Sequence, residues 1–374
     1  MVKDFFKEVS SPVIPGNGQI MTIDFLRGLA SLVILIVHYK HFYMGPELIR
    51  PELGIDNFYF YNLLSPVMAY GANAVQLFWV ISGYVFLHVY GGSLRVSGGK
   101  YVWHRFSRLY PLHFLTLIII ASSQYITYET YGAYSIYHNN GIKDFILHLG
   151  FASEWFGRAG GLSFNGPIWS VSVEIFSYLL FLFFISRSLL SIVNISVLAL
   201  SFGFAHMIFD SMITLCLFYF FTGCLANAIF QTLRKFINEQ LIAVISFIGL
   251  SISVLLLLSS VGIPTMIKCA IGYSTLITLL VSIEYLGKTK YLAKLKWVGD
   301  TSYGNYLWHS PLQVIFIYLC GLGVIDINTV NSGLFFILYI PFMFAFSYLS
   351  FKFFERPAQK NLNRIYENNT TRHQ

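Results

Sequence analysis

The chain has 374 residues, of which 56% are hydrophobic and only 11% are charged, and its formal net charge is +7. Soluble globular domains carry about a quarter charged residues, so this composition excludes a soluble domain. Membrane topology accounts for the positive charge, and we expect no nucleic-acid partner. The aromatic share of 18% suits belts of Tyr and Trp at the two membrane–water interfaces.

Long apolar stretches predict an all-α polytopic membrane protein with about ten transmembrane helices. In chain order these helices lie near 20–42, 67–89, 109–126, 166–185, 190–208, 212–230, 240–259, 264–284, 302–320 and 333–353. A cytoplasmic segment over 1–19 precedes a transmembrane domain over 20–354, and a polar cytoplasmic tail over 355–374 follows. A Gly-rich loop near 91–99 and a long polar loop over 127–165 separate the early helices.

The distribution of Lys and Arg predicts the orientation, because cytoplasmic loops are enriched in both. An even number of spans places both termini on one side. If that side is the cytoplasm, it collects most of the basic residues. The outer side then holds only Lys40, Arg50, Lys143 and Arg158. We therefore expect both termini in the cytoplasm.

The first helix carries three ionisable residues at membrane depth, Asp24, Arg27 and His38. Each needs a partner, a wet cavity or a function, because charge is costly in the bilayer. Eleven residues make about three turns, so Arg27 and His38 share one stripe about 16 Å apart, with Asp24 on the same side. This pattern favours a passage where a cation holds an anionic donor and an imidazole deprotonates an acceptor; a neutralised Asp–Arg pair beside a packed His is the alternative.

The fourth helix brings Glu174, with Trp169 and Ser170, to the outer leaflet near the depth of His38. A carboxylate beside an imidazole can fix its tautomer and raise its basicity. Glu174 or Asp24 could serve His38 in this way, and depth favours Glu174. The alternative for Glu174 is a hydrogen bond within its own helix.

Other polar residues support a site less directly. Arg105 and Arg108 lie at the cytoplasmic mouth of the third helix, where they could clamp phosphates or simply anchor the helix. Tyr306 and His309 could line the passage, with packing of His309 as the alternative. Tyrosines recur at every third position from Tyr125 to Tyr137, which is more typical of an interface than of sugar stacking. No pair of the four cysteines has zinc-ligand spacing, so we expect neither a metal site nor a disulfide framework.

Six motifs occur in order along the chain: Arg27 to His38 with Asp24 before them, Phe78-Trp79-Val80-Ile81-Ser82-Gly83, Arg105-Phe106-Ser107-Arg108-Leu109-Tyr110-Pro111, Trp169-Ser170-Val171-Ser172-Val173-Glu174, Ser302-Tyr303 through His309, and Phe354-Glu355-Arg356-Pro357. With these motifs the chain resembles the acyltransferase 3 family of integral membrane acyltransferases. The resemblance extends over nearly the whole chain. Many members carry two acidic residues after the Trp-Ser motif, whereas here Ile175 follows Glu174.

The resemblance implies O-acyl transfer from acyl-CoA, usually acetyl-CoA, to a sugar hydroxyl of a glycan or lipid-linked saccharide, such as the O-antigen of lipopolysaccharide or an exopolysaccharide. It assigns catalysis to His38 and donor binding to Arg27, Arg105 and Arg108. We expect four further residues to bind the substrate, namely Trp169, Ser170, Tyr306 and His309. It further implies a multi-pass protein of the bacterial inner membrane, in contact with lipid, with no permanently bound cofactor. Because the chain ends soon after the last helix, we expect a stand-alone type without an extracytoplasmic hydrolase domain.

Two other functions fit the charged residues. A secondary transporter for a glycan or organic anion could use Asp24, Arg27, Glu174 and His309 as a proton relay. The absence of a detectable internal repeat counts against it. A non-catalytic scaffold for polysaccharide assembly would tolerate substitution of His38.

Overall fold

The computed structural model describes residues 19–45, 54–91, 97–156 and 161–371. Within these ranges the chain is helical and forms no strand, which confirms the all-α class. Nine helical segments of this described part are long and apolar enough to cross a membrane. The span expected at 302–320 is a helix too, Ser302–Gly321, but it is not among the nine. Its polar residues lower its hydropathy.

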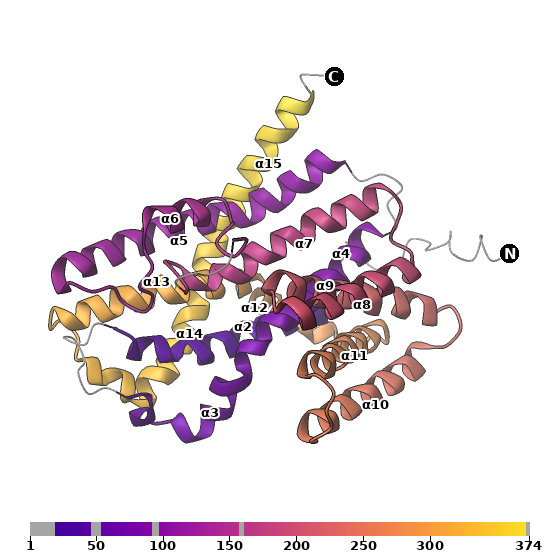
Figure 1. Cartoon of the computed structure of the whole chain (residues 1–374), viewed down its shortest axis with the longest axis horizontal. Coiled ribbons are helices and arrows are strands. Elements are labelled where there is room, and N and C mark those ends of the chain that lie inside the picture. The colour runs from indigo at the N-terminus through magenta and orange to yellow at the C-terminus, as the bar shows by residue number, and fades with distance from the viewer. Residues whose placement is uncertain (1–18, 46–53, 92–96, 157–160, 372–374) are drawn as a thin grey trace. The chain divides into compact units, whose positions relative to one another are not determined.

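The helices follow one another in the predicted order (Figure 1). The longer elements are α2 (Met21–Val37), α3 (Tyr61–Tyr70), α4 (Ala74–Tyr90), α5 (Gly98–Tyr131), α6 (Ile142–Leu149), α7 (Trp169–Ser186), α8 (Ile192–Phe209), α9 (Met212–Leu233), α10 (Glu239–Leu258), α11 (Thr265–Tyr285), α13 (Ser302–Gly321), α14 (Gly333–Ser350) and α15 (Arg356–Thr371). Shorter ones are the 3₁₀ turns η1 (His38–Tyr43), η2 (Ile55–Asn57), η3 (Gly71–Asn73), η4 (Gly166–Ile168), η5 (Lys290–Leu295) and η6 (Ile327–Asn331), the helix α12 (Lys296–Asp300) and the π-helical turn η7 (Phe351–Glu355).

Three boundaries differ from the sequence prediction. Helix α5 begins at Gly98, well before the predicted start, so Arg105 and Arg108 lie inside it. Its Pro111 does not end the helix, and the predicted 127–165 loop contains the helix α6. The predicted polar tail is mostly the helix α15, which continues the chain from the π-helical turn. Residues 1–18 of the expected cytoplasmic segment over 1–19 lie outside the described residues, as do the loop residues Arg50, Arg95 and Arg158.

The chain divides into two compact units. The first comprises Met1–Arg27, Val75–Tyr101 and Phe176–Gly299, and the second comprises Gly28–Ala74, Val102–Ile175 and Asp300–Gln374. Asp24 and Arg27 therefore belong to the first unit, and His38 and most of the other candidate residues belong to the second.

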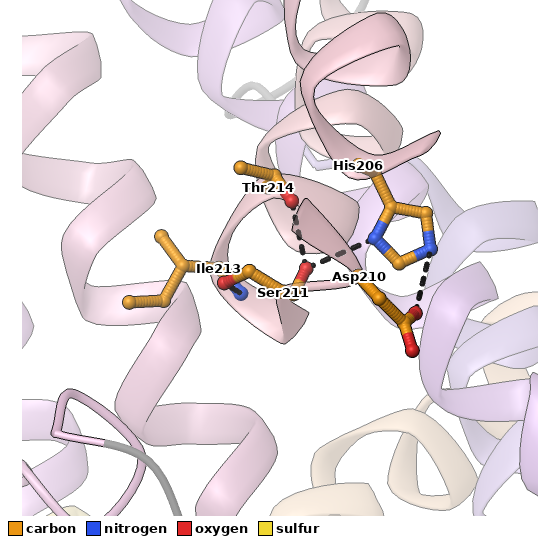
Figure 2. A network of polar contacts seen from close by, with 5 residues as sticks. All are labelled: His206, Asp210, Ser211, Ile213 and Thr214. Carbon is orange, nitrogen blue, oxygen red and sulfur yellow. Dashed lines mark hydrogen bonds and ion pairs between the residues drawn. The ribbon is translucent and has the colours of Figure 1, made fainter. Parts of the chain in front are cut away.

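Helical hairpins build much of the first unit. α8 packs on α9 and α10 packs on α11, as Figure 1 shows. Figure 2 shows the polar contacts that hold the turn between α8 and α9. His206 Nδ1 lies 3.1 Å from the carbonyl oxygen of Ser211, and the Ser211 side chain caps the start of α9. Asp210 adopts the left-handed conformation that reverses the chain, with φ 45°.

A carboxylate caps the start of α2 in this unit. Glu284 of α11 accepts hydrogen bonds from the backbone N–H of Met21 at 2.9 Å and of Thr22 at 2.8 Å, and from the Thr22 hydroxyl at 2.7 Å. These N–H groups have no partner within the helix. A negative charge at this end interacts favourably with the positive end of the helix dipole. The cap fixes the point from which α2 begins.

Two glycines let α4 and α9 touch backbone to backbone. A Cβ on Gly83 would lie 1.8 Å from the carbonyl oxygen of Phe220, and one on Gly223 would lie 2.0 Å from that of Val80. Close approach at small residues is a common way for membrane helices to associate. The Ser82-Gly83 motif thus has a packing role.

We predict that Gly83→Ala destabilises the protein by about 3 kcal/mol or more, because the new methyl group collides with backbone that cannot rotate away. The thermal unfolding midpoint of purified protein in detergent measures the effect. Gly262→Ala is the matched control, since no atom lies within 4 Å of its added Cβ. Equal midpoints for the two variants would contradict the packing role.

Candidate functional site

His38 stands where α2 changes from α-helix to 3₁₀-helix in the second unit. The α-helix ends at Val37 and the 3₁₀ turn η1 begins at His38. Such a change within a continuous helix often marks a functional position. The Tyr39 hydroxyl donates to the Val330 carbonyl at 2.7 Å and so anchors η1 to the turn η6.

Three imidazole rings meet at this point. The ring centroids of His38 and His309 are 4.7 Å apart and the rings are stacked, with an interplanar angle of 20°. His41 lies 4.7 Å from His38 and 6.0 Å from His309, again centroid to centroid. His309 is fully buried in α13, whereas His38 is half-buried. The cluster joins η1 to the centre of α13.

The protein fixes the tautomer of His38. Its Nδ1 lies 3.1 Å from the carbonyl oxygen of Ile34, which can only accept, so Nδ1 carries the proton. The neutral ring then presents an unprotonated Nε2. No hydrogen bond from another described residue reaches this Nε2. A ring held in this way is a base with its lone pair available.

The other two rings have the same tautomer. His309 Nδ1 donates to the Asn305 carbonyl at 3.0 Å. Gln313 donates its amide N–H to the His38 carbonyl at 2.9 Å. Its Oε1 therefore faces His41 and accepts a hydrogen bond from Nδ1–H at 3.0 Å. His41 Nε2 then accepts from the Tyr137 hydroxyl at 3.2 Å. Each imidazole is thus set by a specific acceptor.

A polar stripe on α13 supports the cluster. Asn305, His309 and Gln313 are spaced four residues apart and are all fully buried. Asn305 donates to the Ser31 hydroxyl of α2 at 3.2 Å, and His309 stacks on His38 one level further along. Asn305, Gln313 and His41 are not among the residues predicted from the sequence. The four-residue spacing of polar residues in an apolar helix could have revealed the first two.

Two predicted substrate-binding residues meet in this unit. The Ser170 hydroxyl lies 2.6 Å from the Tyr306 hydroxyl, and the latter also donates to the Pro167 carbonyl at 2.9 Å. Both side chains are buried, and Trp169, which begins α7, is half-buried. Tyr306 precedes His309 by one turn, so this pair lies next to the imidazole cluster.

The hydrogen bond that sets the His38 tautomer comes from backbone, not from a carboxylate. Sequence reasoning gave this role to Glu174 or Asp24, but the ring nitrogen that needs an acceptor has the Ile34 carbonyl. The carbonyl one turn back in a helix can accept from Nδ1 in a suitable rotamer, and the sequence does not reveal the rotamer. Glu174 lies close enough to Tyr303 of α13 to interact with it electrostatically.

The predicted donor-binding arginines lie in different parts of the chain. Arg27 pairs with Asp24 in α2, with Nη1 3.5 Å from Oδ1. Arg105 and Arg108 lie half-buried in α5 of the second unit. Like Glu174, Arg108 and the buried Glu355 of the π-helical turn act electrostatically on Tyr303. The Tyr303 hydroxyl itself donates to the Leu109 carbonyl at 2.8 Å.

One member of the tyrosine series contributes to the site. Tyr137 reaches His41, and its ring occupies space that only Gly166 leaves open, since a Cβ there would lie 2.3 Å from the ring. Tyr128 and Tyr134 stack on each other with centroids 4.7 Å apart. Tyr131 contacts Tyr318 of α13 instead, and Tyr125 is exposed.

A second pair of histidines ties the segment before α7 to α5. His113 Nε2 donates to the His148 carbonyl at 2.7 Å, and His148 Nε2 lies 2.9 Å from the Ser163 hydroxyl. Burial lowers the pKa of His148 to about 3, with His113 as the second cause. His148 therefore stays neutral at any physiological pH and serves as a structural hydrogen-bonding group.

Asn165 repairs a gap that Pro311 opens in α13. Proline lacks an N–H, so the Leu307 carbonyl, four residues earlier, loses its helical partner. The Asn165 amide donates to this carbonyl at 3.0 Å. Because His309 lies between Leu307 and Pro311, Asn165 stabilises the turn of α13 that presents His309.

The residues that the structure describes include no group of His, Cys, Asp or Glu arranged to hold a metal ion. All four cysteines lie in this described part, where they are buried and unbridged.

Comparison with known proteins identifies the family. The family model for an acyltransferase domain, acyltransferase 3, matches residues 21–352. The chain belongs to the acyltransferase 3 family. Its match spans all the helices from α2 to α14. No solved structure matches the chain.

Two curated relatives are similar to this acyltransferase 3 protein over part of their lengths. Protein 2 in the picA locus of Rhizobium radiobacter is 32% identical over 107 residues, which cover 28% of this chain and 45% of the relative. The peptidoglycan O-acetyltransferase OatA of Listeria monocytogenes is 33% identical over 91 residues, 24% of this chain and 14% of the relative. The matched region thus spans less than half of either relative.

We predict that Asn165→Ala lowers the stability by about 1–3 kcal/mol, because the Leu307 carbonyl is left buried and unpaired. Pro311→Ala restores the missing N–H. In the Pro311→Ala background, Asn165→Ala should therefore lower the stability by clearly less than it does in the wild type. Thermal midpoints of the wild type, the two single variants and the double variant form the cycle. Strict additivity of the two substitutions would contradict the repair.

Proposed function

We propose that this acyltransferase 3 protein moves an acetyl group from acetyl-CoA to a sugar hydroxyl of a surface or exported glycan, such as O-antigen or exopolysaccharide. The observation that carries the proposal is the fixed tautomer of His38, whose available Nε2 is suited to general-base catalysis. The name of the relative OatA, an O-acetyltransferase of peptidoglycan, supports acetyl as the group and a glycan as the acceptor.

The proposed reaction needs one base that removes the proton from the sugar hydroxyl. His38 Nε2 takes the hydroxyl proton as the sugar oxygen attacks the thioester carbonyl. The tetrahedral intermediate collapses, the C–S bond breaks, and the thiolate of CoA takes the proton from the imidazolium. The Ile34 carbonyl accepts a hydrogen bond from Nδ1–H throughout, so it stabilises the ring in both its neutral and its charged state.

The proposed donor is anionic, and the arginines of α2 and α5 are its expected partners. Guanidinium groups bind phosphate through paired, charge-assisted hydrogen bonds. Arg105 and Arg108 lie one turn apart on α5, and Arg27 lies on the helix that leads to His38. In a bacterial inner membrane, with both termini in the cytoplasm, these arginines would face the cytoplasm, the compartment that supplies acyl-CoA.

We predict that His38→Ala lowers the rate of acetyl transfer by at least about a hundredfold, the contribution of a positioned general base. Release of CoA from acetyl-CoA by purified protein with a glycan acceptor measures the rate. His138→Ala is the matched control, because His138 is an exposed histidine of the same unit. An alanine variant of His38 with wild-type turnover and an unchanged thermal midpoint would refute the mechanism.

Arg108→Ala should raise the KM for acetyl-CoA about tenfold or more, with a smaller change in kcat, because a charged hydrogen bond to phosphate is lost. Arg187→Ala is the control, since the Arg187 guanidinium lies 3.9 Å from the centre of the Phe183 ring at the end of α7. The same dependence of rate on acetyl-CoA concentration in the Arg108 variant and the wild type would rule out this donor contact.

A further inference from the structure

Two buried hydrogen-bond acceptors on one face of α13 have no donor. The Asn305 Oδ1 and the His309 Nε2 are fully covered, and no residue of the described chain donates a hydrogen bond to either. The two residues are four apart, so their side chains project from the same face of the helix. His309 stacks on His38, which places this face beside the proposed base.

Neighbouring contacts identify both atoms as acceptors. Asn305 Nδ2 donates to the Ser31 hydroxyl, whose own proton goes to the Gly28 carbonyl, so the other amide atom of Asn305 is the oxygen. His309 donates a hydrogen bond from Nδ1–H to the Asn305 carbonyl, so Nε2 carries a lone pair. The face therefore presents two neutral acceptors in series.

An unpaired buried acceptor is costly, and native structures contain few of them. The pair would be satisfied by a ligand that carries two neutral N–H or O–H donors at matching separation. Residues four apart on a helix are offset by about 6 Å along its axis.

The pantetheine arm of acyl-CoA has such donors. Its two amide nitrogens flank a β-alanine unit and are four bonds apart, about 5 Å in an extended chain. We infer that the two amide N–H groups of the donor's pantetheine arm bind this face of α13, the amide nearer the thioester at His309 and the farther one at Asn305. This inference rests on the proposed function.

The assignment follows the order of groups along the arm. The thioester must reach His38, so the nearer amide lies beside the ring stacked on His38, and the farther amide lies one turn away. Because both acceptors are covered in this structure, the arm reaches them only when the side chains over them move apart. Hydrogen bonds gained at both atoms favour that opened arrangement.

Acetyl-CoA analogues in which one amide N–H is replaced by an ester oxygen test the inference on full-length protein in detergent. In the wild type each replacement should raise KM about tenfold. In Asn305→Leu the farther-amide analogue should lose its penalty, with a KM within about twofold of that for acetyl-CoA, whereas the nearer-amide analogue should keep its penalty. Asn305→Met provides a second variant if the leucine does not fold.

Ser31→Ala is the matched control, because it removes the same hydrogen bond between α2 and α13 but leaves the Asn305 Oδ1 in place. Both penalties should persist in it. The inference is overturned if the wild type shows no penalty, or if the farther-amide penalty is equal in the wild type and the Asn305 variants. Failure of the proposed function gives a different result, namely no consumption of acetyl-CoA by the wild type.

Discussion

The hydrogen bond from His38 Nδ1 to the Ile34 carbonyl is the contact on which the site depends. It links the chemistry of one ring nitrogen to the geometry of the helix, since the acceptor is the backbone of the preceding turn. A second backbone contact acts at the same residue, because Gln313 holds the His38 carbonyl. The ring is thus oriented by α2 itself and secured by α13, without a carboxylate. The proposed base therefore needs no carboxylate to orient it, which avoids placing a further ionised group in the membrane.

The contact between α2 and α13, here called the seam, contains polar groups that would be costly to leave unpaired in a bilayer. Asn305 bonds Ser31, His309 stacks on His38, and Gln313 bonds both the His38 carbonyl and the Tyr339 hydroxyl. The cost of burying these groups is offset where each donor finds an acceptor. Around them, an apolar cluster that includes Leu117, Val314 and Ile317 packs α5 against α13.

The sequence was sufficient for the architecture, because a membrane restricts the chain to helices of a length that composition reveals. It located the helix of His38 and the helix of Ser170, and it identified His309 and Tyr306 as candidates. It could not supply the partners. Tautomers depend on the particular carbonyl that lies near a ring, and the role of Asn165 depends on a proline distant in sequence. The start of α5 was misplaced because the Gly-rich stretch and the basic residues before Leu109 were interpreted as a loop, whereas the helix already begins at Gly98.

The seam also bears on how the protein is made. The hairpins α8–α9 and α10–α11 join neighbours in the chain, so each pair can associate soon after synthesis. The bonds of Asn305 to Ser31 and of Gln313 to His38 instead join residues 274 and 275 positions apart. Until the intervening helices and α13 have been synthesised, these polar groups of α2 lack their partners on α13. The imidazole cluster is therefore completed only near the end of biogenesis, and a chain truncated before α13 would contain His38 without the α13 residues that contact it.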